Sequence, residues 1–142
     1  MTIARLIEGR SAAIISIDSS ATVREAVALL AERRIGALPV MEGGRIVGIF
    51  SERDVVYGLA GQGAAMLDGP VGAAMTAPVI TVEPQTEVLS ALALMTRRRV
   101  RHLPVIDGAA MVGFISIGDL VKHRIERIES EAQAMRSYIQ SA

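Results

Sequence analysis

The stretch LPVMEGGRIVGIFSERD at residues 38–54 returns as LPVIDGAAMVGFISIGD at residues 103–119, displaced by 65 positions. The correspondence continues without a gap toward the N-terminus, where the same displacement aligns Ile17 with Val82, Val23 with Val88, Ala26 with Ala91 and Leu29 with Leu94. Self-similarity at a fixed period indicates repeated units that share a continuous core. The sequence therefore predicts two copies of one structural unit.

Each predicted unit begins with a strand and a helix. The β-branched stretches at residues 14–17 and 79–82 are typical of strands. Thr22 and Glu25 form a capping-box pattern, which predicts a helix that begins just after Thr22 and carries apolar residues on one face. In the second unit we expect Thr86 to cap the corresponding helix.

A β-hairpin and a second helix complete each unit. The pair Gly43-Gly44 lies between two apolar runs, an arrangement typical of a tight hairpin turn. The expected hairpin strands are 38–41 and 45–50 in the first unit and 103–106 and 111–115 in the second. A helix is expected to follow each hairpin, from about Ser51 and from about Ser116.

We expect an α/β (α+β) fold in which two β-α-β-β-α units pack as a pseudo-two-fold pair, followed by a long C-terminal helix. A unit of roughly 50 residues buries too little apolar surface to fold alone, so the two units should pack together. The Gly- and Pro-containing segment 63–70 is predicted to be a linker. The expected divisions are 1–62 for the first unit with its N-terminal segment, 71–125 for the second unit, and 126–142 for a C-terminal helical extension.

An apolar seam runs along the predicted C-terminal helix. Its residues alternate spacings of four and three: Val121, Ile125, Ile128, Ala132, Met135 and Ile139. The interpretation that we favour is that the first half of the seam packs on its own domain. The alternative is a partner helix, most simply the same helix of a second subunit.

The overall composition narrows the classes of partner. Fifteen Lys and Arg residues balance fifteen Asp and Glu residues, which gives no reason to expect nucleic acid or an anionic membrane as a partner. The absence of Cys excludes disulfides and Cys-based zinc sites. No apolar run approaches the roughly 18 residues that a membrane span needs, and the first residues lack a signal-peptide pattern. We therefore expect a cytoplasmic protein.

The sequence gives little support for catalysis or metal chemistry. The two histidines, His102 and His123, lie in no recognisable catalytic motif. There is no His-x-x-x-His pattern, no carboxylate cluster with ligand spacing and no phosphate loop of the Walker type. We expect a non-catalytic protein that requires no metal.

The repeated motif resembles the CBS motif. The resemblance is carried by Leu-Pro-Val, then an acidic residue and Gly, then Val-Gly-x-x-Ser-x-x-Asp, present twice in order and covering roughly residues 3–125. It implies pairing of two units into one module, frequent homodimerisation, and binding of AMP, ATP or NAD-type nucleotides. It also implies a role in regulation.

The Ser-x-x-Asp element has two interpretations. A carboxylate at a helix start can accept hydrogen bonds from vicinal ribose hydroxyls, while a nearby hydroxyl donor faces a phosphate. The resemblance implies these roles for Asp54 with Ser51 and for Asp119 with Ser116. The alternative is an ordinary helix cap that needs no ligand.

The run RRRVRH at residues 97–102 is the most concentrated basic feature. Its first two arginines, Arg97 and Arg98, are explained by compensation of the helix dipole and by a solvated face. The resemblance implies that Arg101 and His102 reach the phosphate of a nucleotide whose ribose is held by Asp54. Arg53 is expected to add a phosphate contact.

The two expected clefts differ in charge. The positions that correspond to Arg101 and His102 in the first unit are Gly36 and Ala37, so we expect the Asp119 cleft to lack phosphate-neutralising side chains. Such a cleft would bind weakly, take the nucleoside end of a dinucleotide, or stay empty. By resemblance, Ile80 lines the Asp54 cleft and Ile15 lines the Asp119 cleft.

Two functional hypotheses follow. The first is a nucleotide-responsive module that signals to a separate effector protein or through its own dimer geometry. The second is a structural dimerisation scaffold that keeps the fold and the caps but binds no ligand. Nucleic-acid binding through the arginine run ranks third, because the overall charge is neutral and no aromatic residues are interleaved.

Overall fold

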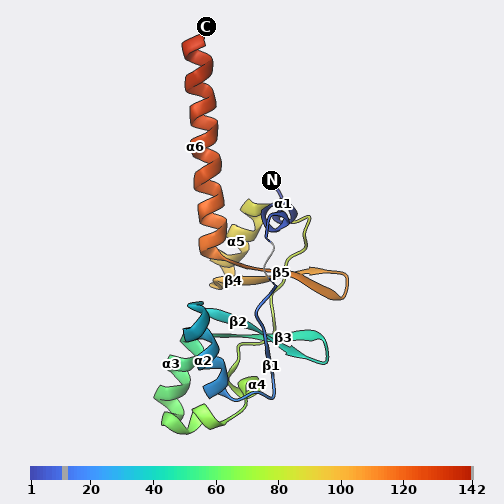
Figure 1. Cartoon of the computed structure of the whole chain (residues 1–142), viewed down its shortest axis with the longest axis vertical. Helices are drawn as coiled ribbons and strands as arrows, with labels where there is room; N and C mark the ends of the chain where they lie inside the picture. Colours follow the sequence, from blue (N-terminus) through green and yellow to red (C-terminus); the bar gives the residue numbers. More distant parts are fainter. Residues whose placement is uncertain (11–12, 142) are drawn as a thin grey trace.

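The computed structural model describes residues 1–10 and 13–141, which form two stacked α/β halves and one long projecting helix (Figure 1). The first half contains β1 (Ile17–Asp18), α2 (Val23–Arg33), β2 (Ala37–Glu42), β3 (Arg45–Ser51), α3 (Glu52–Gln62), the 3₁₀ helix η1 (Gly63–Asp68) and α4 (Val71–Ala74). The second half contains α1 (Ile3–Glu8), α5 (Val88–Arg98), β4 (His102–Asp107), β5 (Ala110–Ser116) and α6 (Ile117–Ser141). The predicted fold class is confirmed.

The two predicted hairpins are present and match in register. Strands β2 and β3 pair antiparallel with Leu38 opposite Phe50, and β4 and β5 pair with Leu103 opposite Ile115. Each hairpin has an irregularity at the same place, after Val40 and after Val105. In the first half β1 adds to the sheet in parallel to β2.

The strands predicted at residues 14–17 and 79–82 are wrong in extent. In the first stretch only Ile17 belongs to a strand, and in the second Val82 makes a single parallel bridge to Val105. Ile14 and Ile15 of the first stretch and Val79 and Ile80 of the second line clefts between the halves. Their β-branched composition indicated extended backbone, but strand pairing also requires a neighbour.

Each half has its own apolar core, and the N-terminal helix crosses to the second one. Ile3 of α1 is fully buried in the second core, and its N–H donates to the carbonyl of Thr86 at 2.8 Å. In the same way Val71 of α4 is buried in the first core and donates to the carbonyl of Ala21 at 2.8 Å. The segment that precedes each unit in the chain therefore completes the other unit, which ties the two halves together.

One of the two predicted helix caps is correct. The Glu25 N–H donates to Thr22 Oγ1 at 3.1 Å, and the Thr22 N–H donates back to Glu25 Oε2 at 3.2 Å. The prediction for Thr86 is wrong, because the N-cap of α5 is Glu87. The Thr86 hydroxyl instead accepts the Glu83 N–H at 3.1 Å, since Glu87 is the residue that the repeat aligns with Thr22.

Most of segment 63–70 is the 3₁₀ helix η1, which packs against the first half. Its Met66 is buried in the first core. The end of the Met66 side chain occupies the space where a Cβ on Gly58 would lie, so a larger residue at that position would require Met66 to move.

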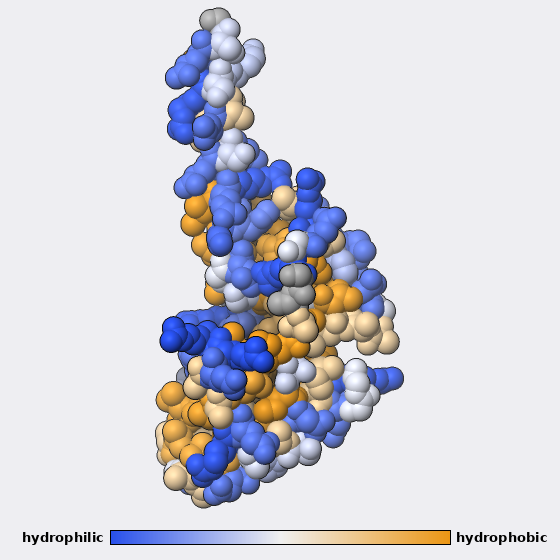
Figure 2. All heavy atoms as spheres, in the orientation of Figure 1, coloured by the Kyte–Doolittle hydropathy of each residue, from blue (hydrophilic) through white to orange (hydrophobic). Residues whose placement is uncertain are grey.

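Helix α6 packs against α5 and β5 with its first two turns and then projects from the body (Figure 1). Leu120 anchors it in the second core, but Val121 and Ile125 are 42% and 50% exposed. The expectation that the first half of the seam packs on its own domain is therefore wrong, because the helix axis runs away from the body. Figure 2 shows α6 as a projection with hydrophilic residues over much of the visible face. No helix within the described residues is long and apolar enough to cross a membrane.

Candidate functional site

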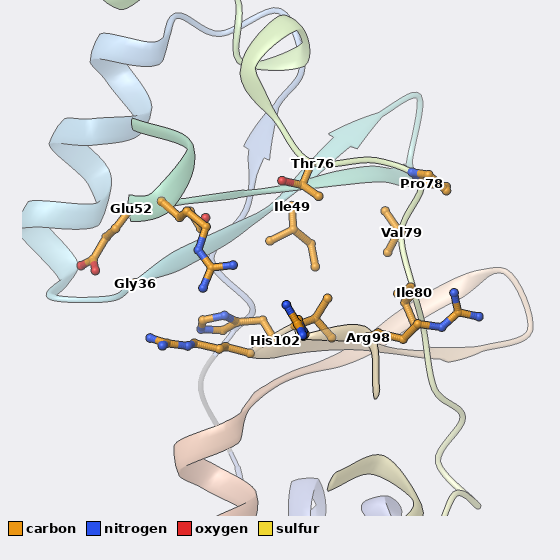
Figure 3. A pocket seen from close by; sticks show the side chains of 14 residues that line it. Gly36, Ile49, Glu52, Thr76, Pro78, Val79, Ile80, Arg98 and His102 are labelled. Atoms are coloured by element: carbon orange, nitrogen blue, oxygen red, sulfur yellow. The ribbon is translucent and has the colours of Figure 1, made fainter. Parts of the chain in front are cut away.

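The candidate site is a cleft between the two halves, called the first cleft below. Its volume is about 430 Å³, which lies within the range of roughly 300–1,000 Å³ found for small-molecule sites. Figure 3 shows Ile49 and Thr76 on one wall facing His102 and Ile80 on the other. The lining residues are Gly36, Ile49, Ser51, Glu52, Arg53, Thr76, Pro78, Val79, Ile80, Arg98, Arg99, Val100, Arg101 and His102.

Five of the predicted site residues line this one cleft: Ser51, Arg53, Ile80, Arg101 and His102. The sixth, Asp54, lies behind the wall. Its Oδ2 accepts the Ser51 N–H at 2.8 Å and the Ser51 hydroxyl at 3.2 Å, while its Oδ1 accepts the Thr76 hydroxyl at 2.8 Å. Because Thr76 does line the cleft, the carboxylate is separated from the cleft by a single hydroxyl donor.

The first cleft is strongly basic. Arg53 comes from the first turn of α3, and Arg98, Arg99 and Arg101 come from the end of α5 and the loop that follows it. The interpretation of Arg98 as part of a solvated helix face is incomplete, because Arg98 also lines the cleft. Arg99 adopts a left-handed conformation with φ of 53°, which ends α5 and turns the arginine run across the cleft.

His102 lies between two clefts and contributes to the lining of both. Its ring stacks on Phe114 with ring centroids 5.5 Å apart and an angle of 13° between the planes. Burial lowers the pKa of His102, and the Arg101 charge lowers it further, whereas Asp119 and Glu52 partly offset these effects. The imidazole is therefore mostly neutral at pH 7 in the free protein.

A second cleft, of about 630 Å³, opens on the other side of His102. The predicted residues Ile15, Ser116 and Asp119 all line it. The Ser116 N–H donates to Asp119 Oδ2 at 2.8 Å, and the Asp119 N–H donates to Ser116 Oγ at 3.1 Å. This arrangement reproduces the helix start at Ser51 and Asp54, as the repeat requires.

The expectation that the second cleft lacks phosphate-neutralising side chains is wrong. Arg10 and Arg34 both line it, and Arg10 Nη2 lies 3.1 Å from Asp119 Oδ1. Comparison of aligned motif positions missed both residues. Arg10 arrives with the crossed N-terminal segment, and Arg34 is the left-handed residue that ends α2, equivalent to Arg99.

The Asp119 carboxylate is ionised at neutral pH. Burial raises the pKa of Asp119, but hydrogen bonds from Ser116 and Arg10 and the charge of Arg10 outweigh burial and hold the pKa below its usual range. An ionised carboxylate accepts hydrogen bonds only, so it suits a ligand that presents hydroxyl groups. Among the described residues, no three His, Asp or Glu side chains gather as metal ligands.

The chain is similar to proteins of one family along most of its length. The family model described as CBS domain matches it twice, over residues 11–61 and 71–126. The CBS domain-containing protein CBSX3 of Arabidopsis thaliana, described as mitochondrial, is 40% identical over 124 residues, which are 84% of this chain and 60% of that protein. The chain thus spans about 60% of the length of this relative.

Solved structures of the same kind share the fold. A protein with CBS domains from Burkholderia ambifaria is 40% identical, with a TM-score of 0.83 over 89% of this chain and 95% of that chain. The CBS domain pair of protein MJ0100 is 22% identical, with a TM-score of 0.78 over 89% of this chain and 98% of its own. That pair was crystallised with 5′-methylthioadenosine and S-adenosyl-L-methionine.

Proposed function

The chain belongs to the CBS-domain family, and on that premise we propose that it is a regulatory sensor that binds adenosine-containing nucleotides of the AMP, ATP or NAD type. The ligand occupies the first cleft, the protein catalyses no reaction of its own, and the bound state is read by an effector protein or through a dimer. Adenosine ligands in the related MJ0100 pair support the ligand class.

The observation that carries the proposal is the chemical difference between the two walls of the first cleft. One wall offers the Asp54 carboxylate through the Thr76 hydroxyl, and the other offers Arg101 and His102. Ribose hydroxyls replace the Thr76 hydroxyl as donors to Asp54, and the phosphate lies against the arginines, where charge-assisted hydrogen bonds are strong. A single nucleotide thus contacts both halves.

The apolar part of the cleft suits the adenine ring. Ile49, Val79 and Ile80 line the cleft and supply aliphatic surface against which the ring can pack. The basic residues favour ligands with phosphate over 5′-methylthioadenosine, which carries none. This preference is our reason for proposing AMP, ATP and NAD-type ligands.

Ligand binding regulates by changing the relative free energy of different arrangements of the halves. Because one ligand contacts both halves, its binding favours the arrangement in which both sets of contacts are made. The segments α1 and α4 already tie the halves together, so the change is a small adjustment around a fixed topology.

A thermal-shift panel of AMP, ADP, ATP, NAD, NADH and S-adenosylmethionine tests the proposal. A ligand at about 100 times its dissociation constant adds roughly 2.7 kcal/mol to the free energy of unfolding, which gives a clear rise in the midpoint. We expect the largest rises with phosphate-bearing ligands. No rise with any of the six compounds contradicts the proposal and favours the scaffold without ligand.

We further propose that a second copy of the chain covers the seam of α6. The seam residues Val121, Ile125 and Ile128 are exposed over about half of their surface or slightly less, and the seam continues to Ile139. In a parallel two-stranded coiled coil, a charged residue that flanks the apolar seam at position i of one helix lies close to position i+5 of the partner helix. Here that pairing brings Arg124 to Glu129 and Glu131 to Arg136, so both pairs are attractive.

A further inference from the structure

The two aspartates that end the motifs have different partners. Asp54 receives a neutral donor, the Thr76 hydroxyl, at 2.8 Å. Asp119 receives a charged one, the Arg10 guanidinium, at 3.1 Å. The second nitrogen of that guanidinium, Arg10 Nη1, also donates to the Phe114 carbonyl at 3.4 Å. The repeat therefore conserves the carboxylate but changes the chemical nature of the group that a ligand must displace.

Each partner comes from a crossed segment that packs on a hairpin glycine, although the repeat aligns Arg10 with Met75 and not with Thr76. The side chain of Ile7 lies against Gly113, where an added Cβ would meet Ile7 Cγ2 at 3.2 Å. In the other half Met75 lies against Gly48. Each crossed segment thus docks on the glycine of the opposite hairpin and then delivers a side chain to the aspartate, Thr76 in the first half and Arg10 in the second.

When a ligand displaces the partner of the aspartate, the consequences differ between the two clefts. When ribose hydroxyls replace Thr76, one hydroxyl donor is exchanged for others and no charge loses its partner. When ribose hydroxyls replace Arg10, the guanidinium loses its counter-charge. An uncharged nucleoside leaves that loss uncompensated, whereas a phosphate offers the guanidinium a new anionic partner with bidentate geometry. Arg34 lies in the same cleft and adds a second positive charge.

We propose that Arg10 is a displaceable partner of Asp119 that makes the second cleft selective for phosphate-bearing nucleosides over neutral ones. This inference rests on the proposed function, because it assumes that the protein binds adenosine compounds. It assigns Arg10 as a specificity-determining residue of the second cleft. In the ligand-free protein the ion pair between Arg10 and Asp119 opposes the binding of neutral nucleosides. In the bound protein Arg10 contacts the phosphate.

The test is calorimetric titration of AMP and adenosine into Asp54→Asn, a near-isosteric change that weakens ribose binding in the first cleft, with and without Arg10→Gln. Arg10→Gln should tighten adenosine roughly two- to fivefold, because an exposed ion pair no longer opposes binding. The same change should weaken AMP roughly tenfold, because the phosphate loses a charge-assisted contact. If the role of Arg10 were purely structural, Arg10→Gln would change the affinities for both ligands in the same direction.

Matched variants show which residue and which cleft cause the changes in affinity. Arg5→Gln removes another exposed arginine of the same N-terminal segment and should leave both affinities unchanged. Binding that Asp119→Asn abolishes belongs to the second cleft. If the wild-type protein binds neither AMP nor any other compound of the thermal-shift panel, the proposed function fails. If AMP binds but is abolished by Asp54→Asn alone, or if Arg10→Gln changes both affinities in the same direction or neither, the inference about Arg10 is overturned and the proposed function stands.

Discussion

Asp54 serves the start of α3 before any ligand arrives, because its carboxylate accepts three hydrogen bonds from Ser51 and Thr76. The two interpretations of the Ser-x-x-Asp element are therefore compatible. A ribose that replaces the Thr76 hydroxyl leaves both hydrogen bonds from Ser51 in place. The cap keeps the carboxylate oriented for the ligand.

Asp54→Ala should reduce the thermal shift produced by AMP to the part that the second cleft contributes, and lower the free energy of unfolding by about 1 kcal/mol, the usual cost of losing a cap. Thr22→Ala is the matched control, because it removes a capping box of α2 and Thr22 does not line the first cleft. The control should lose similar stability and keep the full response to AMP. An unchanged AMP shift in Asp54→Ala would contradict the assigned role.

The stability of the protein should fall as the pH falls below about 6.5, because of His102. Burial lowers the pKa of the folded-state imidazole below its value of 6.5, with Arg101 acting in the same direction and Asp119 and Glu52 opposing it. As the pH falls through 6.5 the unfolded chain therefore takes up a proton before the folded chain does, and the free energy of unfolding decreases. The decrease stops below the folded-state pKa.

Urea denaturation of the wild type and of His102→Gln between pH 8 and pH 5 measures this effect. The wild type should lose more stability over that interval than the variant, since the variant has no proton to take up at this position. Parallel pH profiles for the two proteins would show that His102 is not the cause. Because the pKa of Asp119 is lowered, the titration of this neighbouring carboxylate lies below the window.

At the residue level, the sequence predicted the parts of the site that lie within the repeated motif. Ser51, Arg53, Arg101 and His102 follow from motif positions, and they line one cleft. Arg10 and Arg34 could not be found in this way. Arg34 reaches the second cleft through a left-handed helix end, and Arg10 through a segment that crosses to the other half, and neither feature follows from the aligned residues.

Among the elements, α1 and α4 do most, for their length, to hold the two halves together. Each is short, yet each buries its first residue completely in the core of the other unit. The apolar residues of α1, Ile3, Leu6 and Ile7, have helical spacing, whereas α4 spans only four residues. Sequence patterns indicated α2, α3, α5 and α6 but gave no sign of the crossing, which depends on contacts between residues far apart in the chain.

Ile3→Ala should destabilise the protein by about 2–5 kcal/mol, the cost of removing a fully buried large aliphatic side chain. Arg5→Ala, on an exposed face of the same helix, should change stability by less than about 0.5 kcal/mol. Chemical denaturation of both variants gives the comparison. Equal and small effects would mean that α1 does not complete the second core in solution.

At the scale of the whole molecule, α6 is the element that needs a partner. Its first turn is anchored by Leu120, whereas the large apolar residues of the seam beyond it are exposed over roughly half of their surface or more. A parallel pair of α6 helices would hold two modules side by side and place four clefts in one assembly. Ligand-dependent movement of the halves would then reach the partner through the base of α6.

A charge-exchange series tests the parallel arrangement. Arg124→Glu should weaken the dimer, because it places like charges at the expected Arg124–Glu129 contact between chains. Adding Glu129→Arg should restore it, since the pair is attractive again with reversed polarity. Sedimentation equilibrium measures both dissociation constants. A monomeric wild type, or a double variant weaker than the single one, would contradict the arrangement.

The most direct measurement of the shared-cleft claim is a crystal structure of the protein with AMP. The account predicts that the ribose hydroxyls lie within about 3.2 Å of the Asp54 carboxylate while the phosphate contacts Arg101 on the opposite half. AMP bound to one half alone, or bound outside the first cleft with Asp54 still held by Thr76, would contradict it.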